Sequence, residues 1–148
     1  MHSEINQMSI KFQSRSNNEA FARQAVAAFA AQLDPTIEEI NDIKTAVSEA
    51  VTNCIVHAYR DTIGPIQIVA RVLENNTAYI KVKDRGCGIE DVKKAMEPLF
   101  TTAPEEERAG LGFAVMESFM DTLRVFSTPG KGTSVVMKKK LTSRVRHG

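Results

Sequence analysis

Residues 66–83 read IQIVARVLENNTAYIKVK, and this stretch decides the fold. Two runs rich in β-branched and apolar residues, Ile66 to Leu73 and Ala78 to Lys83, are separated by the polar stretch Glu74 to Thr77. Short apolar runs joined by a short polar connection predict a β-hairpin. Because strands joined by a tight turn run antiparallel, we expect a sheet with substantial antiparallel pairing.

Before this hairpin, the sequence predicts one strand and one helix. Alternating apolar residues from Met8 to Ser14 fit a half-buried strand. The alanine-rich segment Glu19 to Leu33 favours a helix, with Asn17 or Asn18 as its N-cap. The Asp34-Pro35 step ends this helix.

A second helix follows directly. Thr36, with Glu39 three residues later, forms the pattern of a capping box. Apolar residues then recur at spacings of three and four, so we expect the helix to continue to about Tyr59. The members of this apolar stripe are Ile37, Ile40, Ile43, Val47, Val51 and Ile55.

After the hairpin, the chain alternates turns with shorter elements. In order, we expect a glycine-rich turn at Asp84–Gly88, a short helical piece at Asp91–Met96, a polar segment at Glu97–Ala109, a helix at Gly110–Met120, and strands at Leu123–Phe126 and Thr133–Lys139 joined by the turn Pro129–Gly132. This order predicts an α+β fold with the helices on one face of the sheet. Without repeats or linkers, residues 1–148 are expected to form a single domain.

Composition narrows the class of protein. The net charge of +1 gives no global field for binding nucleic acid or an acidic membrane, so we expect neither as a direct partner. Cys54 and Cys87 form no CxxC pair and are expected to be free thiols in a reducing compartment. Neither a signal peptide nor a membrane span is expected, which favours the cytoplasm.

The first segment suited to chemistry is SEAVTNCIVH, residues 48–57. Glu49, Asn53 and His57 follow one another at intervals of four residues and therefore form one polar ridge on the second helix. On an arbitrary helix this would be a solvated face, but here apolar residues flank the ridge. An amide oxygen is a suitable Mg²⁺ ligand, and a carboxylate one turn away can accept a proton.

Two further segments suit a bound nucleotide. Asp84 ends a strand and precedes two glycines in DRGCGI; it can accept a hydrogen bond from an exocyclic amine such as adenine N6, although such a turn is also common without a ligand. Gly110-Leu111-Gly112 is expected at a helix start, where N–H groups favour phosphate, and Arg108 precedes it. Signatures of P-loop, dinucleotide-fold, nucleophile-elbow and HExxH zinc sites are all missing from the sequence.

Taken in order, these segments resemble the N, G1 and G2 boxes of the GHKL ATPases, which include gyrase and histidine kinases. The stretches SEAVTNCIVHAY, DRGCGI, EPLFTTAPEEERAGLGFAVMESFMD and KGTSV further resemble the sporulation anti-sigma factors that are also serine kinases. The resemblance extends from FARQAVAAF to KGTSV, nearly the whole chain. It implies a two-layer α/β sandwich of the Bergerat type, with a mixed, largely antiparallel sheet.

The resemblance also implies roles for single residues. Glu49 would be the general base and Arg108 would contact the γ-phosphate. The nucleotide-binding residues would be Asn53 as the Mg²⁺ ligand, Asp84 on adenine with Gly86 and Gly88 beside it, Thr133 near the base, Gly110, Leu111 and Gly112 on the phosphates, and Thr101 and Thr102 in an ATP lid that spans Leu99–Ala109. Arg23 would contact the sigma factor.

The chain departs from the pattern of these proteins at two positions. Ala103 stands in LFTTAPE where relatives usually have lysine, which removes a cation near the phosphates. Ala58 follows His57 where glycine is common. We expect His57 itself to be a structural helix residue and not a phosphoacceptor.

The function implied by the resemblance is an anti-sigma factor that uses Mg-ATP. It would bind and inhibit a sporulation sigma factor, phosphorylate a serine of its anti-anti-sigma antagonist, and act as a homodimer. Alternatives are an ATP-gated anti-sigma module with little kinase activity and a related stress-response anti-sigma kinase. The catalytic domain of a histidine kinase is disfavoured, because we expect no helix pair with a phosphoaccepting histidine ahead of the first strand.

Overall fold

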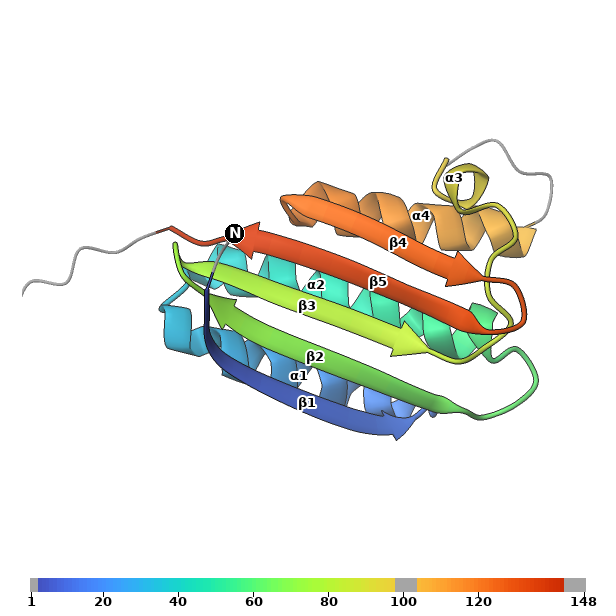
Figure 1. The fold of residues 1–148 in the computed structure, drawn as a ribbon, viewed down its shortest axis with the longest axis horizontal. Coiled ribbons are helices and arrows are strands. Elements are labelled where there is room, and N and C mark those ends of the chain that lie inside the picture. Colours follow the sequence, from blue (N-terminus) through green and yellow to red (C-terminus); the bar gives the residue numbers. More distant parts are fainter. Residues whose placement is uncertain (1–2, 98–103, 143–148) are drawn as a thin grey trace, which may run out of the picture.

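The fold is a two-layer α+β sandwich (Figure 1). The computed structural model describes residues 3–97 and 104–142, and it describes side chains in these ranges except for 104–110. Strands β1 (Glu4–Gln13), β2 (Pro65–Leu73), β3 (Thr77–Asp84), β4 (Thr122–Thr128) and β5 (Gly132–Lys140) form one sheet in the order β1-β2-β3-β5-β4. Every neighbouring pair in this sheet is antiparallel, so the described strands do not show the mixed sheet that the resemblance implies. The predicted α+β class is confirmed.

The helices all lie against one face of the sheet (Figure 1). They are α1 (Asn17–Ala30), α2 (Ile37–Asn53), α3 (Val92–Ala95) and α4 (Pro104–Phe119), with a short 3₁₀ turn η1 (Ala31–Leu33) after α1 and a π-helical turn η2 (Cys54–Ala58) after α2. The opposite face of the sheet carries no helix of the described chain. Of the helices, α2 is the central one: it packs between α1 and α4.

The β2–β3 hairpin forms as the sequence predicts. Ile66 pairs with Asp84 at one end and Leu73 with Thr77 at the other. In the turn, Asn75 and Asn76 have φ values of 62° and 56°. Two successive left-handed residues match the twist of the flanking strands, and asparagine tolerates this conformation better than most residues.

The two predicted helix starts have different outcomes. The capping box of α2 is confirmed: Thr36 Oγ1 accepts from the Glu39 N–H at 3.1 Å, and a Glu39 carboxylate oxygen accepts from the Thr36 N–H at 2.8 Å. The asparagine cap of α1 is wrong, because Asn17 is already helical and Ser16 occupies the cap position without a side-chain bond. Asn18 instead donates its amide to the Gln13 carbonyl at 2.9 Å.

The core lies between α2 and the sheet. Most of its fully buried residues come from α2, the three inner strands and α4, and they include Ile43, Val47, Val51, Ile66, Ile68, Ile80, Val82, Met116 and Met137. The stripe predicted on the second helix therefore faces this core in its middle, while Ile37 at the helix start is exposed. Packing of this stripe fixes the rotation of α2, and with it the direction of the polar ridge.

The last helix begins earlier than predicted. The sequence suggested a start at Gly110, but α4 begins at Pro104. Proline is favoured at the first helical position, and the acidic run 105–107 that follows complements the positive end of the helix dipole. Gly110 and Gly112 consequently lie inside a helix and not at its start.

Candidate functional site

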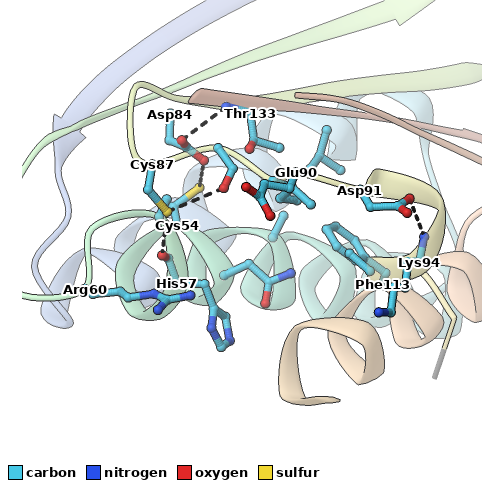
Figure 2. A pocket seen from close by; sticks show the side chains of 17 residues that line it. Cys54, His57, Arg60, Asp84, Cys87, Glu90, Asp91, Lys94, Phe113 and Thr133 are labelled. Carbon is cyan, nitrogen blue, oxygen red and sulfur yellow. Dashed lines mark hydrogen bonds between the residues drawn. The ribbon is translucent and has the colours of Figure 1, made fainter. Parts of the chain in front are cut away.

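A pocket of about 550 Å³ opens where the C-terminal end of α2 meets one end of β3 and β5 (Figure 2). Its wall also includes the loop after β3, helix α3 and Phe113 of α4. Four residues predicted at the site line it together: Asn53, Asp84, Gly88 and Thr133. Since α2, β3 and β5 are far apart in sequence, the fold brings these residues together.

Asp84 is held rigidly at the base of the pocket. Asp84 is only 5% exposed and is the last residue of β3. Oδ1 accepts from the N–H groups of Gly86 at 2.9 Å and Thr133 at 3.2 Å, and Oδ2 accepts from the Cys54 thiol at 3.5 Å. Burial raises the pKa of Asp84, and these donors partly offset the increase.

The two glycines after Asp84 allow the loop to press against its neighbours. A side chain at Gly86 would collide with the Ala58 carbonyl, and one at Gly88 would collide with the Thr128 carbonyl. Gly88 also has φ of 74°, which disfavours other residues. The shape of this loop therefore requires glycine at both positions, and the loop forms one wall of the pocket.

Two hydroxyl groups fix this loop to the rest of the fold. Tyr59 donates to the Pro65 carbonyl and accepts from the Arg85 N–H, each at 2.6 Å. Ser127 accepts from the Ile89 N–H at 2.7 Å and lies 2.8 Å from the hydroxyl of Thr133. The loop is thus fastened at both ends, which keeps the wall of the pocket in place.

The polar ridge of α2 meets α4 on the other side of the pocket. A Cβ placed on Gly112 would lie 3.1 Å from Asn53 Oδ1 and 3.3 Å from Glu49 Oε2. The two ridge residues therefore face the glycine segment of α4, as the predicted site requires. The Asn53 Nδ2 atom is buried and has no hydrogen-bond partner within the described residues. An unpaired buried amide is costly unless a ligand satisfies it.

Glu49 has the properties of a proton acceptor. It is partly buried, and burial together with the nearby negative charge of Glu19 raises its pKa. A raised pKa makes a carboxylate a better base near neutral pH. Glu19 belongs to α1 and forms an ion pair of 2.9 Å with Arg23. Arg23, which is predicted to contact a partner, is therefore ion-paired with the residue whose charge raises the pKa of Glu49.

A magnesium ion would use the amide oxygen of Asn53 and not its unpaired Nδ2, which is a hydrogen-bond donor. No cluster of three or more His, Cys, Asp or Glu that could hold a metal occurs within residues 3–97 and 111–142. A magnesium ion at this site would thus need phosphate oxygens and water besides the Asn53 amide oxygen, which is how Mg²⁺ commonly binds with nucleotides.

Several predicted site residues remain untested by the structure. Thr101, Thr102 and Ala103 lie outside the described residues, as do the side chain of Arg108 and most of the predicted lid. Leu111 is on α4 and half exposed.

His57 is in the π-helical turn at the rim of the pocket and not on a regular helix as expected (Figure 2). Helix α2 ends at Asn53, and π turns of this kind often occur at functional sites.

Sequence reasoning missed three residues that shape the site. Cys54 donates to Asp84, while Tyr59 and Ser127 hold the loop. The sequence showed Cys54 directly after Asn53, but nothing in it places a thiol against a carboxylate 30 positions away. The two hydroxyl residues carried no signal, because their roles depend on how β2 and β4 approach the loop.

Comparisons with known proteins agree with this geometry. The family model for the histidine kinase-like ATPase domain matches residues 12–139. An anti-sigma F factor of Caldanaerobacter subterraneus subsp. tengcongensis is 69% identical over 134 residues, which are 90% of this chain and 93% of that protein. The chain belongs to the anti-sigma F factor family. An anti-sigma F factor of Clostridium acetobutylicum is 56% identical over 91% of this chain and 94% of its own length.

Solved structures support the fold of this anti-sigma F family member. The RsbU and RsbW domains of a Mycobacterium tuberculosis protein match with a TM-score of 0.70 and 21% identity, over 95% of this chain and 33% of that one. A histidine kinase domain of Erythrobacter litoralis matches with a TM-score of 0.57 and 22% identity, over 83% and 60%. The predicted GHKL fold and family are confirmed, and an ATPase domain of this family implies ATP binding.

No helix of the described chain combines the length and the apolar character needed to cross a membrane.

Proposed function

We propose that this protein is an anti-sigma factor that binds Mg-ATP in the pocket described above and phosphorylates a serine of its anti-anti-sigma antagonist. The observation that carries the proposal is the buried, unpaired NH₂ group of Asn53, a donor suited to a phosphate oxygen. Asn53 and Glu49 both lie next to Gly112 of α4, and Asn53 lines the same pocket as the fixed carboxylate of Asp84. Such an arrangement suits a ligand with a nucleobase at one end and phosphates at the other.

The base would bind at Asp84. Because Oδ1 is occupied by two backbone donors, Oδ2 is the atom that can accept from the exocyclic amine of adenine. The Cys54 thiol donates to the same oxygen, and burial raises the thiol pKa well above its usual range, so the thiol stays protonated. Thr133 would lie beside the base, and Gly86 and Gly88 would form the adjacent wall.

The phosphates would bind near Asn53. The magnesium ion would be held by the Asn53 amide oxygen and by phosphate oxygens, and it would offset the phosphate charge. Gly110, Leu111 and Gly112 would donate backbone N–H groups, with Arg108, Thr101 and Thr102 closing over the phosphates. These N–H groups lie inside α4 here. Donation to phosphate therefore requires the helix to begin later in the nucleotide-bound protein.

Glu49 would act as the base for the acceptor serine. Its raised pKa and its position beside Asn53 suit removal of a proton from a hydroxyl close to the γ-phosphate. The hydroxyl oxygen attacks the γ-phosphorus, the bond from phosphorus to the β-γ bridging oxygen breaks, and ADP leaves. The chain's own contribution is to position the hydroxyl and to accept its proton.

The partners follow from the family. Relatives at 56–69% identity are called anti-sigma F factors, which supports a sporulation sigma factor as the protein that this chain inhibits. Arg23, on α1 with its side chain 37% exposed, would contact that factor. We further propose that the protein acts as a homodimer in the cytoplasm.

The test is transfer of label from γ-labelled ATP to the cognate anti-anti-sigma protein in the presence of Mg²⁺. Wild type should label a serine of that protein, and Glu49→Gln should abolish the label while ATP still binds. As a control, Glu117→Gln changes an exposed carboxylate on α4 and should transfer normally. If wild type binds ATP and the sigma factor but transfers no phosphate, the protein is an ATP-gated binding module and the kinase proposal is wrong.

A further inference from the structure

The face of the sheet opposite the helices has an ordered arrangement of side chains. The strand registers place outward residues in three rows that cross all five strands. These rows are Lys11-Gln67-Lys83-Ser134-Phe126, Ser9-Val69-Lys81-Val136-Arg124 and Gln7-Arg71-Tyr79-Lys138-Thr122. Figure 1 looks onto this face, and every helix lies behind it. We call these three rows the open face.

The open face is strongly basic. Its three rows contain six lysines and arginines and no acidic residue. The chain as a whole has a net charge of only +1, so its remaining surface is net negative. Glu4 pairs with Arg71 at 3.1 Å near the end of β2. The positive charge is therefore separated onto one side of the described sheet.

The aromatic rings of the open face are already in contact with cations. The Arg71 guanidinium lies 4.8 Å from the centre of the Tyr79 ring, and the Lys138 ammonium lies 6.0 Å from it. The Arg124 guanidinium lies 6.0 Å from the centre of the Phe126 ring. Nucleobases need free ring faces for stacking, so these contacts disfavour single-stranded nucleic acid. They also hold the cationic groups close to the sheet, ready to pair with carboxylates.

We infer that the open face is a second protein-binding surface, which docks a carboxylate-rich surface of a partner polypeptide. Two facts carry this inference: the six cations in three regular rows, and the absence of any helix of the described chain over them. A flat array of fixed charges complements an acidic surface and speeds its encounter. A second copy of the chain presenting the same face would be repelled, because like charges would meet.

The surface is separate from the nucleotide pocket. Outward residues of β3 alternate with inward ones, so Lys81 and Lys83 lie on the side of the sheet opposite Asp84 and the core. The inference therefore does not depend on the proposed kinase activity. A substitution on the open face should leave ATP binding unchanged, which allows the two proposals to fail independently.

The test uses the full chain and fluorescently labelled poly-L-glutamate, with binding followed by fluorescence anisotropy. The double variant Lys81→Gln/Lys83→Gln removes two central cations of the open face. The matched control Lys44→Gln/Lys93→Gln removes the same charge from α2 and α3, which lie on the helical side. We expect the open-face variant to bind about tenfold more weakly, with an effect below about twofold in the control. Added salt should weaken binding by the wild type.

Three results would overturn the inference. Equal losses in both double variants would show attraction to net charge alone. Tighter binding of an oligo-dT strand than of poly-L-glutamate at the same salt, lost in the open-face variant, would make the surface a nucleic-acid site. Sedimentation that shows a wild-type dimer missing in the open-face variant would make the surface a contact between copies. If Lys81→Gln/Lys83→Gln does not fold, Arg124→Gln/Lys138→Gln should give the same loss.

Discussion

Replacement of Asp84 by asparagine tests how the pocket selects its base. The side chain keeps its shape, and its remaining oxygen can still accept from the N–H groups of Gly86 and Thr133. The new NH₂ group then takes the place of Oδ2, where adenine is proposed to donate. An acceptor is replaced by a donor, so the variant should reject a 6-amino purine and accept a 6-keto purine.

The magnitude follows from the hydrogen bond that is lost. A hydrogen bond to a charged group contributes about 1.5–3 kcal/mol, which corresponds to about 10- to 150-fold in affinity. Titration calorimetry with ATP and with inosine triphosphate measures both changes. ATP binding should fall by this factor, while inosine triphosphate should bind the variant more tightly than it binds wild type.

A stability measurement distinguishes a change in nucleotide selectivity from unfolding of the Asp84→Asn variant. Burial raises the folded-state pKa of Asp84, so the stability associated with its protonated form is present at low pH and is lost as pH rises through that pKa. The asparagine side chain has no such titration, and the thermal midpoint of Asp84→Asn at neutral pH should not fall. Asp91→Asn is the control, because Asp91 lines the pocket but caps α3 through the Lys94 N–H at 3.0 Å. The reasoning is refuted if Asp84→Asn binds ATP normally, or loses both nucleotides equally while folded.

Three further substitutions probe other contacts. Glu19→Gln removes a negative charge that raises the pKa of Glu49. The acid limb of the rate–pH profile for phosphoryl transfer should therefore move to lower pH. An unmoved limb would show that the charge of Glu19 does not affect Glu49. Cys54→Ala removes a thiol donor that helps to lower the pKa of Asp84, so the pH below which ATP binding weakens should move upward in a calorimetric pH series; an unmoved pH dependence would show that the thiol is dispensable. Gly86→Ala forces a methyl group against the Ala58 carbonyl and should reduce the free energy of unfolding by about 1–3 kcal/mol in urea titrations; an unchanged midpoint would contradict the packing described for the loop.

Much of the fold was predictable because its signals are local. The β2–β3 hairpin, the capping box at Thr36 and the buried stripe of α2 each depend on residues a few positions apart. The order of the strands was not predictable in this way. The placement of β5 between β3 and β4 depends on which edges and faces can be buried together, and no short pattern in the sequence encodes that choice.

The site residues, too, were predictable where their signals are local and were missed where their roles depend on packing. Asn53 and Asp84 were predicted from motifs and Thr133 from the family resemblance, and the structure places all three in one pocket. The predicted start of α4 at Gly110 was wrong. Two glycines suggested that a helix begins there, whereas Pro104 and the acidic residues after it favour an earlier start. Cys54 was missed as a contact of Asp84, since its role depends on the packing of α2 against β3.

The central claim is that the pocket binds Mg-ATP through Asn53. It is tested most directly by titration calorimetry of wild type and Asn53→Ala with ATP, with and without Mg²⁺. The account predicts that Mg²⁺ strengthens ATP binding by wild type, and that this increment is lost in a folded Asn53→Ala protein. ATP binding that is absent in wild type, or a magnesium increment that persists in Asn53→Ala, would contradict it.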